Sequence, residues 1–242
     1  MKFYSLANRN LKEIFRDPVS VLLGLVTPLL MLVIFTSINK NIPLEIFSPK
    51  SMTPGIVVFS FTFLIMFSAM LLAKDKQTAF LVRLFTTPLK SSDYIISYIL
   101  PFIPLAFLQV IVCYVVGTLL GGVFINILLS LLIYLLVAFV CISLGVVLGS
   151  LFTVNQVSGI GSILITFISI FSGVWMDLKM VGGIFETIGN ILPFAHAVNA
   201  LKAVTAGSGI SVIFSDVLII LCYAFGLFLL AVLSFVRTMK KV

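Results

Sequence analysis

The sequence predicts an all-α, polytopic membrane protein with six transmembrane helices, and two observations lead to this prediction. First, 61% of the 242 residues are hydrophobic and only 10% are charged, whereas about a quarter of the residues in soluble domains are charged. Second, the apolar residues form uninterrupted runs that are much longer than the helices and strands of soluble domains. We therefore expect lipid to surround most of the chain, and we interpret residues 1–242 as a single transmembrane domain.

Six of these runs are long enough to cross a membrane. A helix of about 20 mainly apolar residues covers the hydrocarbon layer of a bilayer. The predicted spans are residues 19–38, 54–73, 94–120, 125–150, 157–175 and 212–236. Pro101 and Pro104 interrupt the third span near one end, and the uncharged residues 153–156 separate the fourth span from the fifth.

The distribution of Lys and Arg predicts the orientation of the spans, because short loops rich in these residues stay in the cytoplasm. Eleven of the 15 Lys and Arg residues fall before span one, between spans two and three, or after span six. The other four are Lys40, Lys50, Lys179 and Lys202. We therefore expect a multi-pass protein of the plasma (cell inner) membrane with both termini in the cytoplasm. An even number of spans independently requires both termini to lie on the same side.

Three segments outside the spans have features of their own. Residues 2–17 place apolar side chains at helical spacing with basic residues largely on the other face, which predicts an amphipathic interfacial helix that ends before Pro18. Residues 74–93 form a basic cytoplasmic loop whose apolar residues favour a short helix ending before Pro88. Residues 176–211 carry glycines and a proline between two weak apolar patches, which favours short external re-entrant helices.

The sequence lacks the patterns of an enzyme or an ion-coupled carrier. No Asp, Glu, Lys or Arg stands in the middle of a predicted span, where proton- or sodium-coupled carriers usually need a polar site. There is no GxxxxGK[ST], HExxH or GxSxG motif, so we expect no catalytic, cofactor-binding or metal-binding residue in this chain. The net charge of +7 indicates contact with anionic lipid rather than nucleic acid, because no basic face is interleaved with aromatic residues.

Two isolated polar residues leave alternatives open. His196 is the only histidine, and it follows Pro193 in the predicted external segment, where it serves either the structure or contact with a substrate. Asp216 lies about five residues into span six, so it is either an interfacial residue or part of a transport pathway.

Span five carries one continuous face of small and polar residues on an otherwise apolar helix. The residues of this face, at a spacing of three to four, include Ser158, Ser162, Thr166, Ser169 and Gly173. In a membrane such a face points at protein or water, so it either packs against a helix or lines a transport path or a subunit seam. Gly117 with Gly121, and Gly145 with Gly149, form GxxxG motifs that favour close helix packing within one subunit.

Several stretches together resemble the type-2 permease family of ABC exporters. LKEIFRDPVSVL at 11–22 is similar to the interfacial helix that runs into the first span of that family. RLFTTPLKSSDYIISYIL at 83–100 is similar to the family signature that follows the second span. FSGVWMDL at 171–178 and LPFAHAVNALKAV at 192–204 are similar to the external end between spans five and six.

This resemblance implies partners for the chain. In that family two permeases pair around a central path and a separate ATPase, which binds ATP and Mg, docks beneath each. The resemblance makes residues 74–93 the ATPase-coupling loop and makes a second permease copy, in a homodimer or heterodimer, the other partner. The residues of the coupling loop that match the family are Arg83, Leu84, Thr86, Thr87, Pro88 and Leu89.

The expected function is therefore that of an efflux permease. It would form the transmembrane path for a hydrophobic or amphipathic compound, such as a drug or an antimicrobial peptide, driven by the separate ATPase. Two alternatives remain open from the residues: a permease that exports a polysaccharide or lipid-linked glycan, and a non-transporting membrane protein that assembles with or binds partners.

Overall fold

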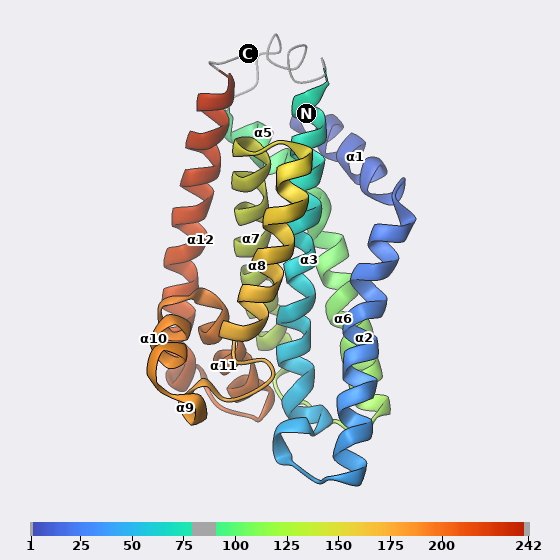
Figure 1. Cartoon of the computed structure of the whole chain (residues 1–242), viewed down its shortest axis with the longest axis vertical. Helices are drawn as coiled ribbons and strands as arrows, with labels where there is room; N and C mark the ends of the chain where they lie inside the picture. Colours follow the sequence, from blue (N-terminus) through green and yellow to red (C-terminus); the bar gives the residue numbers. More distant parts are fainter. Residues whose placement is uncertain (1, 79–90, 240–242) are drawn as a thin grey trace.

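A computed structural model describes residues 2–78 and 91–239, in which every regular element is helical. Six of these helical segments are long and apolar enough to cross a membrane, which confirms the predicted fold class. Figure 1 shows the long helices running side by side. The elements are α1 (Lys2–Phe15), α2 (Pro18–Asn41), η1 (Glu45–Phe47), α3 (Pro49–Gln77), α5 (Ser91–Ile99), η2 (Leu100–Phe102), α6 (Ile103–Leu119), α7 (Ile127–Leu151), α8 (Val154–Phe171), α9 (Leu178–Val181), α10 (Gly183–Ile191), α11 (Pro193–Thr205) and α12 (Ile210–Met239).

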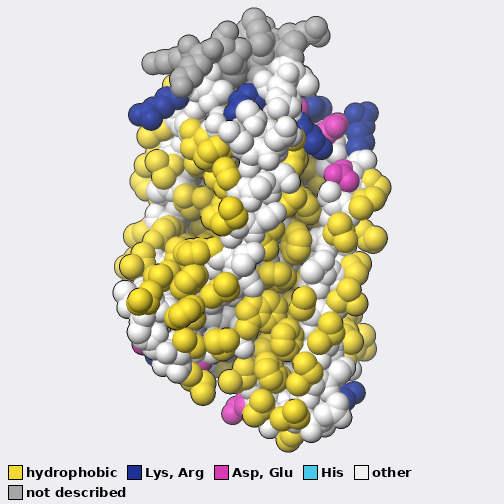
Figure 2. Space-filling model, in the orientation of Figure 1, with side chains coloured by type: hydrophobic (Ala, Val, Ile, Leu, Met, Phe, Trp, Pro, Cys, Tyr) yellow, Lys and Arg dark blue, Asp and Glu magenta, His cyan; other side chains and the backbone are white. Residues whose placement is uncertain are grey.

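The helix α3 lies at the centre of the bundle. In its most apolar stretch 78% of the residues are buried, against 22% in α2, 17% in α8 and 22% in α12. It packs most extensively on α7 and also contacts α2, α6, α8 and α11. The peripheral helices therefore keep most of their apolar surface for lipid, and Figure 2 shows hydrophobic side chains along the length of the molecule.

Both glycines of one predicted GxxxG pair, Gly145 and Gly149 of α7, pack against α3. A methyl group on Gly145 would strike the Ser68 hydroxyl and the Ile65 carbonyl, and one on Gly149 would come within 2.5 Å of the Ala69 carbonyl oxygen. The other pair behaves differently, because Gly117 faces Thr53 while Gly121 has a φ of 97° and lies in the turn after α6. The prediction of packing within one subunit is thus confirmed for Gly145 and Gly149 but wrong for Gly121.

The fifth span begins and ends earlier than the predicted residues 157–175. Thr153 and Gln156 form a capping box that starts α8 at Val154, since the side chain of each accepts a hydrogen bond from the other's backbone. The helix ends at Phe171, shortly before Gly173 adopts a φ of 72°. The predicted loop 74–93 is also shorter at both ends, because residues 74–77 continue α3 and residues 91–93 begin α5.

The α1 helix lies at the end of the bundle that also carries the last turn of α12 (Figure 1); we call it the α1 end. Leu6, Ala7 and Ile14 are buried, and the helix packs on α5 and η2. Asp17 caps α2 and Pro18 occupies its first turn, where a missing N–H costs nothing. An amphipathic helix that turns sharply into the first span is therefore present, as predicted.

Three helices, α9, α10 and α11, occupy the predicted segment 176–211 at the opposite end of the bundle. The α9 and α10 helices are short and mostly uncovered, with Met180 and Ile184 about three-quarters exposed. By contrast, α11 is largely buried and packs on α3, α7 and α12. It closes the opposite end of the core.

Candidate functional site

A cavity of about 460 Å³ opens at the α1 end, between the α1–α2 junction, α3 and the start of α8. Its lining combines charged and apolar side chains, which we call its polar side and its apolar side. The polar lining comes from Glu13, Arg16, Asp17, Ser20 and Lys74. The apolar lining includes Met66, Phe67, Met70, Leu71, Phe102 and Val154. Such a lining matches a molecule that has both a polar and an apolar part.

The charges on the polar side balance one another. Arg16 donates a hydrogen bond to the Glu13 carboxylate at 3.0 Å. Asp17 accepts hydrogen bonds from the Ser20 hydroxyl (2.7 Å) and the Ser20 amide (3.2 Å), and these, together with the nearby Lys74 ammonium, lower its pKa. Two acidic and two basic side chains thus make up the charged part of the lining, which we call the polar rim and which favours neither sign of charge.

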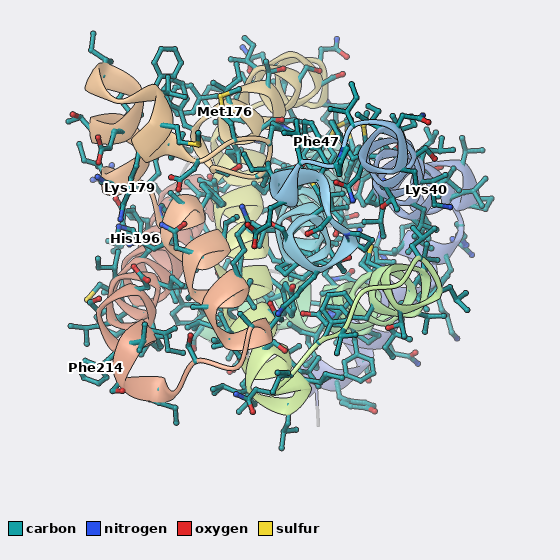
Figure 3. All side chains as sticks on the ribbon, turned by 90° about the horizontal axis from the view of Figure 1, so that it is seen from below. Lys40, Phe47, Met176, Lys179, His196 and Phe214 are labelled. Carbon is teal, nitrogen blue, oxygen red and sulfur yellow. The ribbon has the colours of Figure 1, made fainter. Side chains whose placement is uncertain are left out.

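The apolar side of the cavity continues into a series of aromatic contacts. The ring of Phe67 contacts Phe63, and Phe63 contacts Phe59, with centroids 6.3 and 5.9 Å apart. The series then passes to Trp175, Phe35 and Phe47, with centroid separations of 5.4, 5.1 and 5.4 Å. We call these six residues the aromatic series. It links the cavity at the α1 end to η1 at the opposite end, where Figure 3 shows Phe47.

The predicted polar face of α8 is mostly uncovered. Ser158, Ser162 and Thr166 are exposed, and the hydroxyls of Ser162 and Thr166 donate to carbonyls one turn earlier at 3.0 Å. The opposite face, through Val157, Gly161 and Ile168, is buried, and α8 packs mainly on α3. Figure 2 shows a pale strip along α8 between hydrophobic surfaces. The structure therefore directs this face away from the subunit's own core.

Two other predicted residues of that face have different positions. Ser169 accepts a hydrogen bond of 2.6 Å from the indole N–H of Trp175, which ties α8 to the aromatic series. Gly173 is buried beyond the end of the helix, and its carbonyl accepts a bond from Lys202. The predicted alignment of Gly173 with the serine face is wrong, because α8 ends at Phe171.

A buried carboxylate that the sequence analysis did not single out joins three helices at the α1 end. Asp75, in the last turn of α3, is 4% exposed. Arg9 of α1 donates to both of its oxygens at 2.5 and 2.8 Å, and the Tyr98 hydroxyl of α5 donates at 2.7 Å. Burial lowers the Arg9 pKa, but the hydrogen bond and charge of Asp75 outweigh burial and raise it. A further bond of 3.1 Å, from Asn10 to the Ser97 carbonyl, holds the same helices together.

A second residue that the sequence analysis missed lies within the third span. Gln109 is 1% exposed, and its amide donates to the Gly24 carbonyl at 3.2 Å. Pro28 has no N–H, so that carbonyl lacks its normal donor within α2. Gln109 supplies the replacement that a membrane interior requires. The sequence signal is a mid-span glutamine combined with an intrahelical proline, which a search for charged residues alone does not find.

The predicted coupling residues, Arg83 to Leu89, lie outside the described residues. The elements on either side of them are the last turn of α3, with Asp75, and α5, with Tyr98. Among residues 2–78 and 91–239, no group of three or more His, Cys, Asp or Glu side chains is placed to hold a metal ion.

Comparisons with known proteins agree with this picture. The ABC-2 type transporter family matches residues 1–206, which include every element from α1 to α11. A transport permease, ycf38, of Porphyra purpurea is 30% identical over 124 residues, which are 49% of this chain and 43% of that protein. Its namesake from Pyropia yezoensis is 30% identical over 97 residues, which are 38% of this chain and 33% of that protein. The matched part thus spans less than half of either relative, but the family match covers most of this chain, which therefore belongs to the ABC-2 type transporter family.

Proposed function

We propose that the chain is the permease subunit of an exporter for hydrophobic or amphipathic compounds, driven by a separate ATPase subunit. The family and the names of the relatives support a transport permease. The observation that supports this class of cargo is the cavity at the α1 end, which combines the charge-balanced polar rim with apolar Met and Phe side chains. An amphipathic molecule would place its polar part at the rim and its apolar part along the aromatic series.

The proposed direction of transport starts from the α1 end. Lys and Arg side chains gather at this end in Figure 2, and the positive-inside rule assigns such an end to the cytoplasm. The protein would then be a plasma-membrane protein whose cavity opens to the cytoplasmic leaflet. Cargo would leave at the end formed by η1, Trp175 and α9–α11.

A second copy of the permease would complete the path. Ser158, Ser162 and Thr166 are small or polar and lie on an uncovered face of α8. Small residues allow close approach of helices in lipid, and hydroxyls tolerate a water-lined path. The aromatic series lies next to α8 through the Trp175–Ser169 bond. We therefore place the subunit seam and the path along this face.

Filling the cavity tests the proposed cargo site. Met70 lines the cavity and is half-buried, so a Met70→Trp variant places a bulky ring in the space. We expect ATP-dependent accumulation of a fluorescent zwitterionic amphiphile in inside-out vesicles to fall by roughly tenfold, a size typical of steric changes in an apolar pocket. Leu221→Trp, on the lipid-facing side of α12, adds the same ring elsewhere and should transport like the parent. Equal transport by both variants would remove the cavity from the path.

The proposed ATPase partnership has its own test. Coexpressed with an ATPase subunit and purified gently, the permease should bring the ATPase with it, and the double variant Arg83→Glu, Leu84→Glu should lose it because the loop's charge is reversed and its apolar contact removed. The matched control is Lys40→Glu, a charge reversal at the opposite end of the bundle (Figure 3). A properly folded permease that never retains an ATPase would favour the partner-binding alternative.

A further inference from the structure

The last turn of α3 bonds to helices on two sides of the bundle. Its Asp75 side chain contacts α1 and α5, as described above. The next residue, Lys76, points in a different direction, because consecutive positions of a helix are about 100° apart. Its ammonium donates to the backbone carbonyls of Ser150 at 2.9 Å and Phe152 at 2.8 Å. The end of α3 is therefore attached to the end of α7 as well.

Lys76 binds α7 where that helix lacks donors of its own. The last carbonyls of an α-helix have no N–H partner within the helix and carry a partial negative charge. α7 ends at Leu151, and Phe152 caps it in an extended conformation. An ammonium has three hydrogens to donate, so one lysine can bind both carbonyls. The Thr238 hydroxyl of α12 donates to the same Ser150 carbonyl at 3.0 Å, so α3 and α12 hold the end of α7 together.

The segment that Lys76 binds leads directly into α8. Thr153 follows Phe152 and is the N-cap of α8, where it forms the capping box with Gln156. The turn between α7 and α8 thus consists of Phe152 and Thr153. Figure 1 shows α7 and α8 joined at the α1 end. Because the turn is so short, a shift of the Phe152 carbonyl moves the start of α8.

Apolar packing joins α3 to α8 beside this contact. Ala73 of α3 and Val157 of α8 belong to one small buried cluster, and Val154 packs against it. Val154 also lines the cavity at the α1 end. The turn that Lys76 binds therefore leads both to the cavity lining and to the helix that carries the uncovered polar face.

Close helix packing already fixes α7 itself to α3. Gly149, in the last turns of α7, lies against the backbone of Ala69, where an added methyl group would come within 2.5 Å of the carbonyl oxygen. This contact ends before the turn. The bond from Lys76 to Phe152 extends beyond the last residue of α7, so it holds the turn, which helix packing alone does not reach.

We propose that Lys76 is a positioning residue that makes the α7–α8 turn, and with it Val154 and the start of α8, follow the end of α3. Its role in transport rests on the proposed function. The residues proposed to dock on the ATPase, Arg83 to Leu89, follow α3 in the sequence. A displacement there would reach the cavity and the polar face of α8 through Lys76, because coupling between sites is carried by bonded and packed elements.

The first test needs neither the ATPase nor a cargo. In Lys76→Met the apolar part of the side chain stays and the ammonium is lost. Backbone hydrogen exchange should accelerate about tenfold, the size expected for losing bonds from a charged donor. The acceleration should appear at the end of α7 and also at the first hydrogen-bonded amides of α8, which begin with Val157. Lys76→Arg keeps a cation with several N–H donors and should recover most of the protection.

Thr238→Val is the matched control for this measurement. It removes the other donor to the Ser150 carbonyl but leaves the bond from Lys76 to Phe152 in place. Exchange should then accelerate only at the ends of α7 and α12. If the acceleration in Lys76→Met stopped at the end of α7, or were absent, the proposal would be overturned, because Lys76 would do no more than cap α7.

The second test asks whether this connection couples ATP hydrolysis to transport. In proteoliposomes that contain the permease and an ATPase subunit, we measure how much fluorescent zwitterionic amphiphile is moved per ATP hydrolysed. Lys76→Met should lower this ratio about tenfold, within the usual range of coupling between two sites, and Thr238→Val should match the parent. An effect on stability alone would leave the ratio unchanged.

The two tests separate this proposal from the exporter hypothesis. An unchanged ratio in Lys76→Met, in an assembly that transports, would refute transmission through Lys76 and leave the exporter standing. A parent that neither retains an ATPase nor moves the amphiphile would refute the exporter instead. Hydrogen exchange in the permease alone would then still decide whether Lys76 sets the position of α8.

Discussion

Replacing Gly145 by alanine is expected to destabilise the protein strongly, although it adds only one methyl group. The new methyl group would collide with the Ser68 hydroxyl and the backbone carbonyl of Ile65, so either α3 or α7 must move. Ser68 also donates to the Ile142 carbonyl across this contact at 3.3 Å. Overpacking usually costs about 1–3 kcal/mol, and we expect a value near the upper end because a backbone atom is struck.

The measurement is thermal unfolding in detergent, followed by the fluorescence of Trp175, the only tryptophan. Gly226→Ala on α12 is the matched control, because nothing lies within 4 Å of its added methyl group. It should keep or slightly raise the melting midpoint, since alanine favours a helix more than glycine does. Similar midpoints for the two variants would mean that α3 and α7 are not in this close contact.

Replacing Arg9 by methionine should produce the other large loss of stability. It leaves the Asp75 carboxylate, 4% exposed, with Tyr98 but without its cation. Breaking a buried ion pair from one side costs about 3–5 kcal/mol, and we expect about 3 kcal/mol because the Arg9 side chain keeps 35% of its exposure. Asp75→Asn should cost less, since the remaining guanidinium can still reach water.

The double variant Arg9→Met, Asp75→Asn separates charge from packing. Without either charge it should be more stable than the sum of the two single losses predicts. Arg16→Met is the control, because it breaks the exposed pair with Glu13 and should change stability by about 0.5 kcal/mol or less. Additive losses from Arg9 and Asp75 would show that the two side chains do not interact.

The spans and the interfacial helix could be predicted because their signals are local. Long apolar runs indicate which segments are helical. The spacing of Leu6, Ala7 and Ile14 indicates which face of α1 is apolar. The start of α8 was missed although its signal was also local: residues 153–156 were interpreted as a separator, whereas Thr153 and Gln156 form a capping box.

The candidate site could be predicted only in part, because its key contacts join distant residues. The serines of α8 were identified, but sequence periodicity does not say whether a polar face meets its own subunit or another. Asp75 stood in a predicted loop, and nothing in the sequence pairs it with Arg9, 66 residues away. His196 and Asp216 were each noticed, but only the packing of α11 on α12 brings them together.

The unequal burial of the long helices has a consequence for how this permease can evolve. Substitutions in α3 must satisfy neighbours on nearly every side, so most changes there will cost stability whatever they do to cargo. The outward faces of α2, α8 and α12 meet fewer neighbours within the chain, because only 22%, 17% and 22% of the residues in their most apolar stretches are buried. We therefore expect a mutational scan of stability to find one restrictive helix, α3, and permissive helices, α2, α8 and α12, rather than permissive and restrictive depths.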